Sequence, residues 1–261
     1  MTTPRLFVQY PLKDRKHLQL DKEYRHYLKS VLRLREGEKL SLFDGSGWDF
    51  AARLLHFTDE AAFIEILAAY PRPKPIIRIT LAQALPKSDK MDFIIQKATE
   101  LGITKLIPFK SARSVPQIAS DKVSMKQARW QRIARAAAEQ SGRIDVPDIT
   151  EPLPFDDMLT FAGKADAKLI FWEGESRRGI RQTLRNDIPS PAKDIFIIVG
   201  PEGGLAWDEV ERASAEGFIP VSLGKHILRV ETAVVTILSI LQYELGTLGT
   251  MEDTTPLSSW T

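Results

Sequence analysis

Two glycine-bearing turns near the end of the chain hold the residues best suited to chemistry. The first is Gly200-Pro201-Glu202-Gly203-Gly204, which comes directly after the apolar run 195–199. The second lies in VSLGKHILRVETA, residues 221–233, where Leu223-Gly224 precede a loop. Glycine lets a backbone approach a ligand closely, and ligands of open α/β sheets bind at the carboxyl ends of strands. Either turn alone is better explained as a tight strand–helix connection, but the pair, in this order near the end of the chain, is far more specific.

Several common kinds of site are excluded by what the sequence lacks. It has no cysteine, which excludes disulfides, thiolate metal sites and a cysteine nucleophile. It also lacks a G-x-G-x-x-G after a strand, a P-loop and a G-x-S-x-G elbow. The four histidines are scattered without metal-ligand spacing. There is neither a signal-peptide core nor an apolar run of membrane-spanning length, so we expect a cytoplasmic protein without metal or membrane partners.

The elements that must position the two turns have an alternating pattern. Apolar strands are predicted at 76–84, 103–109, 169–172, 195–199 and 219–223, and helices at 88–101, 121–140, 206–216 and 230–245. Ser88 is the expected N-cap of the first helix. Alternation of this kind predicts an α/β fold, a largely parallel sheet with helices on both faces.

A smaller, mostly β region precedes this pattern. Strands are expected at 5–10, 39–44, 48–55 and 62–70, with one short helix at 21–34. In that helix, the side chains of Tyr24, Leu28, Val31 and Leu32 are expected to point inward. Three prolines between residues 71 and 75 then form a stiff linker. We therefore predict a small β-barrel domain over 1–71, an α/β domain over 72–248 and a flexible tail over 249–261.

The net charge conceals a strong asymmetry along the chain. The total is +2, from 36 basic and 34 acidic residues, but residues 72–143 carry +10 and residues 144–261 carry −9. Clustered basic residues bind polyanions because they release counterions from nucleic acid, although a solvated helix surface explains the charge about equally well. The helix 121–140 contributes much of it through Lys122, Lys126, Arg129, Arg132 and Arg135.

The last predicted helix is apolar on most of its sides. Val230, Val234, Ile237, Leu241 and Leu245 recur at helical spacing, and further aliphatic residues occupy its other sides. Such a helix must be covered on most faces. Core burial alone could satisfy this requirement, but the pattern also suits a helix that meets its counterpart across a twofold dimer.

Taken together, the motifs resemble the ribosomal RNA small subunit methyltransferase E family, of the SPOUT class of RNA methyltransferases. The resemblance covers nearly the whole chain. It rests on GPEGG at 200–204 and ILR-x-ETA at 227–233, and on ALPK at 84–87, KATELG at 97–102 and EQSGR at 139–143. In the first domain it rests on HYL at 26–28, VLR at 31–33 and FDG at 43–45. His226 and Val230 depart from the family, which often has Arg and Thr there, and this puts a side-chain contact to the cofactor in doubt.

This resemblance implies a fold, a reaction and partners. The fold would be a PUA-like barrel and then a SPOUT domain with a trefoil knot, and the active unit a homodimer. S-adenosyl-L-methionine (SAM) would bind in a bent form among the knot loops and methylate N3 of a uridine in 16S ribosomal RNA of the small subunit. Leu223, Ile227 and Leu228 could flank the adenine. The expected cofactor-binding residues are Glu173, Gly200, Pro201, Glu202, Gly203, Gly204, Leu223, Gly224, Ile227, Leu228, Arg229 and Thr232.

Methylation at N3 requires the loss of a weakly acidic imide proton, which leaves charge on O2 and O4 of the base. A positioned cation would stabilise that charge, and Arg229 is the expected one unless it pairs with Glu231 or with the partner subunit. Glu202 or Glu231 could accept the proton, and Glu231 serves equally well as an N-terminal helix charge. The expected RNA-binding residues are Arg25, Arg33, Lys87, Lys90, Arg113, Lys126, Arg129, Arg132, Gln140 and Arg143.

Two alternatives stay open at this point. A SPOUT ribose 2′-O-methyltransferase, acting on rRNA or tRNA, uses similar end motifs but usually lacks the barrel and the EQSGR segment. A non-catalytic RNA-binding ribosome assembly factor is the alternative from another class. The intact GPEGG and ILR-x-ETA motifs argue against it.

Overall fold

The computed structural model describes residues 3–87, 90–115, 118–246 and 248–249. These residues form two compact units, the first made of 3–74 with 138–146 and the second of 75–137 with 147–249. The short segment belongs to the first unit because Glu139 accepts hydrogen bonds from the Phe7 N–H at 3.0 Å and the Tyr27 hydroxyl at 3.1 Å. The division therefore differs from the uninterrupted second domain expected over 72–248.

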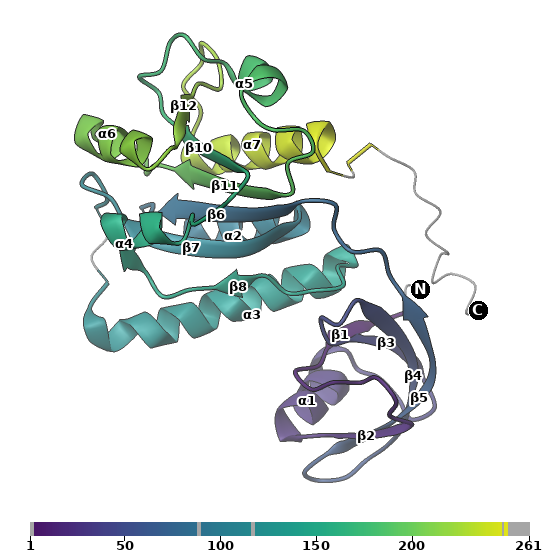
Figure 1. The fold of residues 1–261 in the computed structure, drawn as a ribbon. Coiled ribbons are helices and arrows are strands. Elements are labelled where there is room, and N and C mark those ends of the chain that lie inside the picture. Colours follow the sequence, from purple (N-terminus) through teal and green to yellow (C-terminus); the bar gives the residue numbers. More distant parts are fainter. Residues whose placement is uncertain (1–2, 88–89, 116–117, 247, 250–261) are drawn as a thin grey trace. The chain divides into compact units, whose positions relative to one another are not determined.

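The first unit is a curled five-stranded sheet, shown in purple and blue in Figure 1, with strand order β1-β3-β4-β5-β2. Only β1 and β3 pair in parallel among the strands of this described sheet. The sheet closes over a core that includes Leu6, Leu20, Leu42 and Phe50. Its elements are β1 (Arg5–Phe7), β2 (His17–Leu20), α1 (Lys22–His26), a π-helical turn (Tyr27–Val31), β3 (Lys39–Phe43), β4 (Trp48–Phe57) and β5 (Ala62–Pro71).

The helix predicted over 21–34 is interrupted by the π-helical turn. Asp21 caps α1 by accepting from the Glu23 and Tyr24 N–H groups, and Tyr24 and Leu28 are buried as expected. Leu32 is half-buried, but Val31, predicted to point inward, is 57% exposed. The Leu32 N–H donates to Tyr27 O across five residues, and this extra residue in the turn rotates the next side chains out of α-helical register. Strand β2 is not predicted by the sequence pattern.

The second unit is built on a parallel sheet of order β12-β10-β11-β6-β7-β8, with β9 beside β7. Every strand pair in it is parallel, so the carboxyl ends of the strands meet at one edge. This confirms the predicted α/β class. The strands are β6 (Arg78–Ala84), β7 (Ile103–Lys110), β8 (Asp148–Ile149), β9 (Leu153–Pro154), β10 (Ala167–Phe171), β11 (Asp194–Val199) and β12 (Ile219–Val221).

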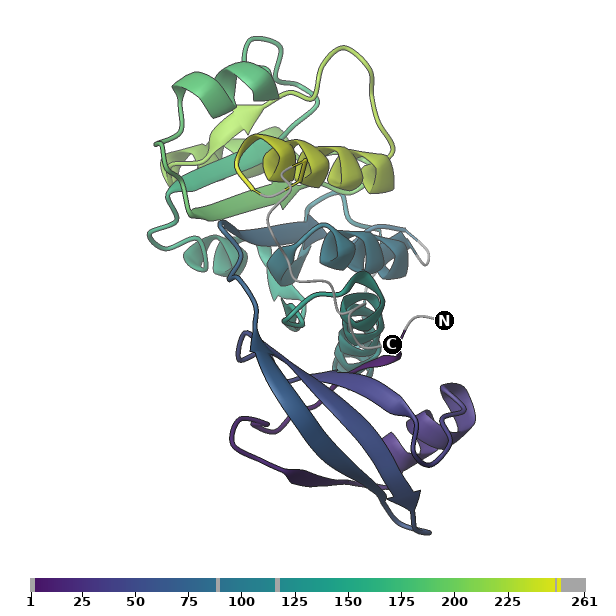
Figure 2. The ribbon, with the colours of Figure 1, turned by 90° about the vertical axis from the view of Figure 1, so that its right-hand side faces the viewer.

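Helices cover both faces of this sheet. In Figure 1 and Figure 2, α2 and α7 lie along one face and α4 and α6 along the other. The Gln242 side chain of α7 donates to Leu101 O at the end of α2, at 3.0 Å, which ties these neighbours together. The helices are α2 (Lys90–Glu100), α3 (Val123–Ser141), α4 (Phe155–Thr160), α5 (Ile180–Asn186), α6 (Trp207–Ala215) and α7 (Val230–Glu244), with a 3-10 turn (Ser120–Lys122) before α3.

The predicted strands and helices of this unit are all present, with ends shifted by a few residues. The short elements β8, β9, α4 and α5 are not predicted, because two to seven residues are too few to show a periodic pattern. Ser88, the expected N-cap of α2, lies outside the described residues, as does nearly all of the expected tail. None of the helices in the described ranges is long and apolar enough to cross a membrane.

Candidate cofactor site

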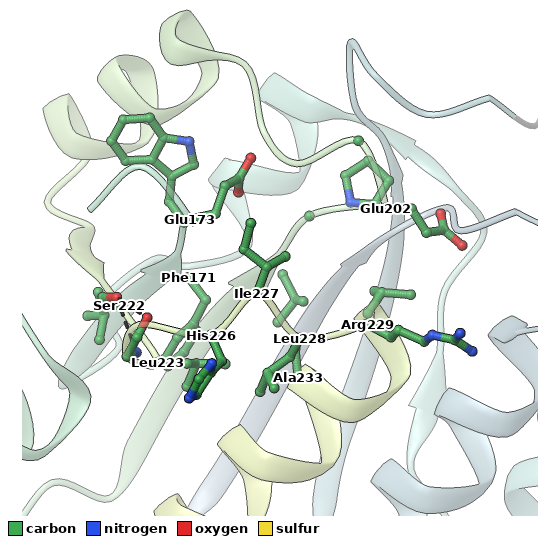
Figure 3. A pocket seen from close by; sticks show the side chains of 18 of the residues that line it. Phe171, Glu173, Glu202, Ser222, Leu223, His226, Ile227, Leu228, Arg229 and Ala233 are labelled. Atoms are coloured by element: carbon green, nitrogen blue, oxygen red, sulfur yellow. Dashed lines mark hydrogen bonds between the residues drawn. The ribbon is translucent and has the colours of Figure 1, made fainter. Parts of the chain in front are cut away.

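A cavity of about 530 Å³ opens at the carboxyl ends of β10, β11 and β12. Its walls come from the segment after each strand, which Figure 3 shows converging from separate parts of the chain. The walls consist of aliphatic and aromatic side chains together with the backbone of several glycines. The lining residues are Lys90, Phe171, Trp172, Glu173, Val199, Gly200, Pro201, Glu202, Gly203, Val221, Ser222, Leu223, Gly224, Lys225, His226, Ile227, Leu228, Arg229, Val230 and Ala233.

The loop after β11 requires glycine at two positions for different reasons. Gly204 has φ +71°, and a Cβ atom there would overlap the Glu173 carboxylate. A Cβ atom on Gly200 would come within 2.9 Å of Leu205 Cγ. Gly200 O also accepts a hydrogen bond, at 3.3 Å, from Nε2 of the fully buried Gln83 on β6. These contacts fix the backbone that forms one wall of the cavity.

A buried carboxylate anchors the same loop from behind. Glu209, 1% exposed on α6, accepts from the Ala206 N–H at 2.8 Å, the Ala112 N–H at 2.9 Å and the Ser111 hydroxyl at 3.0 Å. It thereby holds the start of α6 against the segment after β7. From that segment the Arg113 guanidinium donates to Gly203 O at 3.0 Å. Glu209 was not singled out from the sequence, although its place three residues after a helix start is a recognised capping signal.

The opposite wall is the loop between β12 and α7. Its Ser222 N–H donates to Arg178 O at 2.8 Å, and the Ile180 N–H donates back to Ser222 O at 3.1 Å. Leu223 and Leu228 are half-buried in this wall, whereas Ile227 is 88% exposed. Such a wall offers apolar contacts and main-chain polar groups, which suit an uncharged heterocycle better than a phosphate.

Three charged side chains meet at the edge of the cavity. Lys90 Nζ lies 2.9 Å from Glu202 Oε1 and 3.3 Å from Glu231 Oε2. The Lys87 N–H also donates to the Glu202 carboxylate, at 3.1 Å. Glu231 Oε2 is buried, and its contact with Lys90 lacks hydrogen-bond geometry within the described ranges. Lys90, expected from its charge to contact RNA, is paired with both carboxylates.

This pairing sets the protonation of the cluster. Burial favours the neutral form of Glu202, but hydrogen bonds from Lys90 and the Lys87 N–H outweigh it and lower the pKa of that carboxyl. The hydrogen bond to Glu202 in turn raises the pKa of Lys90. Glu202 is therefore an anion and Lys90 a cation at neutral pH.

Arg229 also lines the cavity but forms no ion pair with these three charged residues. It is exposed, lines the cavity and directly precedes α7. Its guanidinium forms no ion pair or side-chain hydrogen bond with any residue of the described ranges. In the described ranges Glu231 is contacted by Lys90 and forms no ion pair with Arg229.

The cavity gathers ten of the twelve expected cofactor residues. Gly204 and Thr232 are the exceptions: Gly204 is buried behind the wall, and Thr232 is exposed on α7. His226 and Val230, which depart from the family pattern, both line the cavity. Most of the lining residues not expected from the sequence lie at or just after the ends of β10, β11 and β12, where the parallel strand ends could have indicated them, whereas Lys90 begins α2 and Val230 and Ala233 lie on α7. The lining residues outside the expected set are Lys90, Phe171, Trp172, Val199, Val221, Ser222, Lys225, His226, Val230 and Ala233.

The ten expected RNA-binding residues are divided between the two units. In the first unit Arg25 donates to Thr58 O at 2.8 Å, and Arg33 and Gln140 are exposed. Arg143 is only 10% exposed and is paired with Asp145 at 2.8 Å. In the second unit Lys126, Arg129 and Arg132 are exposed along α3, and Arg129 is paired with Asp92 at 2.5 Å. Lys87 and Arg113 flank the Gly200–Gly204 loop.

No group of three or more potential metal-ligating side chains occurs within the described ranges. The cavity instead has the size and mixed lining of a site for a small organic ligand.

Known proteins resemble the chain over nearly its whole length. Family profiles described as an RNA methyltransferase domain and an RNA methyltransferase PUA domain match residues 72–242 and 20–67. Ribosomal RNA small subunit methyltransferase E of Bacillus subtilis is 34% identical, over 84% of this chain and 87% of its own length.

Solved structures agree with these sequence matches. Ribosomal RNA small subunit methyltransferase E from Neisseria gonorrhoeae, solved bound to S-adenosyl methionine, superposes on this chain with a TM-score of 0.84 at 33% identity. The superposition covers 94% of this chain and 99% of the Neisseria chain. A methyltransferase of Legionella pneumophila in complex with SAM gives a TM-score of 0.85 at 32% identity, with the same coverage.

Proposed function

This chain belongs to the ribosomal RNA small subunit methyltransferase E family, and from that membership we propose that it transfers a methyl group from SAM to N3 of a uridine in 16S rRNA. The observation that carries the proposal is the cavity at the carboxyl ends of β10, β11 and β12. It combines the two motif loops with an exposed guanidinium and an ionised carboxylate.

The lining fits the cofactor. Half-buried Leu223 and Leu228 offer apolar surfaces for an adenine ring, and the loops on both sides offer main-chain groups for its polar edge. The sequence has no P-loop motif, whose backbone N–H groups and lysine bind phosphate. When bound, SAM supplies an activated methyl on a sulfonium, so the protein need not activate a leaving group.

The residues beside the cofactor wall serve the uridine. Arg229 can place its guanidinium against O2 or O4, where negative charge develops as the N3 proton leaves. Glu202 lines the cavity as a carboxylate and is the acceptor for that proton. Glu231 is not part of the cavity wall, and its role is to hold Lys90. Alignment of N3 with the methyl group contributes the remainder of the rate.

Three features implied by the family are part of the same proposal. The loops 200–206 and 222–229 form the trefoil knot, and α7 contributes to a homodimer. The 68% exposure of the large Tyr243 side chain on α7 supports a partner surface there. The proposed substrate, small-subunit rRNA, also implies a cytoplasmic location.

The dimer is tested by sedimentation of the purified protein at micromolar concentration. A homodimer should have about twice the chain mass of 29.4 kDa.

The function is tested by transfer of tritiated methyl from SAM to small-subunit rRNA and to assembled subunits, with mapping of the modified base. The proposal expects label on N3 of a uridine. Label on a ribose or on tRNA would indicate the 2′-O-methyltransferase alternative. Failure to bind SAM in calorimetry, with RNA binding intact, would indicate a non-catalytic assembly factor.

A further inference from the structure

A group of exposed arginines lies beside the cavity, in a region of the chain that is otherwise acidic. Residues 144–261 carry ten basic and nineteen acidic side chains. Six of those ten basic residues fall in two short stretches, namely Arg177, Arg178, Arg181, Arg185, Lys225 and Arg229. Most of the cations of this acidic region therefore fall in the two segments that follow β10 and β12.

The backbone brings the two stretches together. The segment 174–180 comes after β10, and the loop 222–229 comes after the neighbouring strand β12. Gly179 and Ser222 form a parallel β-bridge, which the hydrogen bonds of Ser222 with Arg178 O and the Ile180 N–H complete. Because Ser222 and Lys225 line the cavity, Arg178 is attached directly to the cavity wall.

These side chains form no ion pair within 4.0 Å in the part of the chain that the structure describes, although the pKa of Glu175 is lowered by the Arg177 N–H and, to a smaller extent, by the Arg178 charge. Arg177, Arg178, Arg181 and Lys225 are exposed, and none forms a side-chain hydrogen bond or ion pair across those ranges. Other arginines of the same unit are paired, Arg78 with Asp194 and Arg212 with Asp156, both at 2.5 Å. Glu175, the nearest acid along the segment, accepts from the Arg177 and Arg178 N–H groups and so orders the backbone.

We propose that Arg177, Arg178, Arg181 and Lys225 form a phosphate-binding rim that holds the RNA backbone next to the target uridine. We call this set the arginine rim. Its occupant is the phosphodiester backbone, because clustered exposed guanidinium groups complement phosphate oxygens and read no base sequence. The inference rests on the proposed function, since it requires RNA at the cavity. It adds a contact surface outside the basic segment 72–143.

The test compares two double variants of equal charge change. Arg177→Ala/Arg178→Ala removes two rim cations without altering a cavity-lining residue. Lys164→Ala/Lys193→Ala removes two exposed cations that precede β10 and β11, at the opposite edge of the sheet. Binding of a small-subunit rRNA fragment is measured between about 50 and about 300 mM salt, with SAM affinity by calorimetry and oligomeric state by sedimentation as further readouts.

The rim variant is expected to bind the fragment on the order of tenfold more weakly, and its slope of log affinity against log salt should fall by roughly 1.4 to 1.8. SAM affinity should stay within about twofold, and the control variant should behave as wild type. Equal RNA affinities and slopes for the two variants would overturn the arginine rim while leaving the methyltransferase proposal intact. Wild-type protein that neither binds nor methylates rRNA would instead overturn the proposed function. A loss of SAM affinity in the rim variant would also overturn the arginine rim, because it would show that the two arginines support the cofactor loop.

Discussion

The Lys90 ammonium lies 2.9 Å from the Glu202 carboxylate, although the two residues are 112 positions apart in the chain. This contact brings the start of α2 to the loop after β11 and fixes the charge of one of the carboxylates that line the cavity. A lysine assigned from its charge to nucleic acid thus sets the protonation of the group proposed to receive the substrate proton.

Replacing Lys90 should change the pH dependence of methyl transfer. In the native protein the pKa of Glu202 is lowered, so the carboxylate is available above that pKa and is lost as pH falls through it. In Lys90→Met the burial of Glu202 acts without its main counter-charge and raises the pKa. The acid limb of the pH–kcat profile should therefore move to higher pH.

Lys97→Met is the matched control, because Lys97 lies on the same helix, pairs with Glu100 at 2.9 Å and is 34% exposed against 32% for Lys90. Its acid limb should coincide with that of wild type. If the pH–kcat profiles of Lys90→Met and wild type coincide, Glu202 is not the base that accepts the substrate proton.

Replacing Arg229 should affect turnover far more than cofactor binding. Arg229→Gln keeps a polar side chain but removes the cation, so we expect kcat to fall on the order of 10²-fold while the Kd for SAM changes by less than about threefold. Single-turnover methyl transfer and calorimetry measure the two quantities. Arg212→Gln, which removes an arginine of the same unit outside the cavity wall, should leave both unchanged. Full activity of Arg229→Gln would contradict the assigned role.

Two glycines with similar backbone angles should respond differently to alanine. Gly204 has φ +71° and Gly217 has φ +87°, so either substitution should cost about 1 kcal/mol of stability from the left-handed conformation. A Cβ atom on Gly217 has nothing within 4 Å, whereas one on Gly204 would displace the Glu173 carboxylate. Thermal unfolding should show comparable losses, but only Gly204→Ala should weaken SAM binding, by roughly tenfold or more. Equal SAM affinities would show that the loop tolerates the displacement.

The buried carboxylate of Glu209 should contribute strongly to stability. Glu209→Ala leaves the Ala206 and Ala112 N–H groups and the Ser111 hydroxyl without their acceptor, which should lower the free energy of unfolding by about 3 kcal/mol. Urea denaturation measures this loss. Glu211→Ala, an exposed carboxylate on the same helix, should stay within about 0.5 kcal/mol of wild type. Similar values for both variants would contradict the anchoring role of Glu209.

The sequence indicates the framework of this site better than its electrostatics. Apolar runs and glycines predict the strands and the two loops, because periodicity and positive φ are local properties. Glu202, the partner of Lys90, is 112 positions away in the chain, so a local pattern does not reveal their pairing. Charge alone does not distinguish Lys90 from the lysines expected to contact RNA. The π-helical turn after α1 shows the same limit, since nothing in Tyr27–Val31 distinguishes it from an α-helix, and Val31 lies on the outside.

The hydrogen bonds from Phe7 and Tyr27 to Glu139 have a consequence for the order in which the protein is made. The strands and core of the first unit lie within residues 5–71, but the unit also includes residues 138–146, so a nascent chain that has released only its first 74 residues from the ribosome cannot yet form the two hydrogen bonds to Glu139. Most of α3 must be synthesised first, although domains ordinarily fold as their own residues emerge. The amino-terminal unit is therefore begun first and completed only after the polymerisation of more than half of the chain.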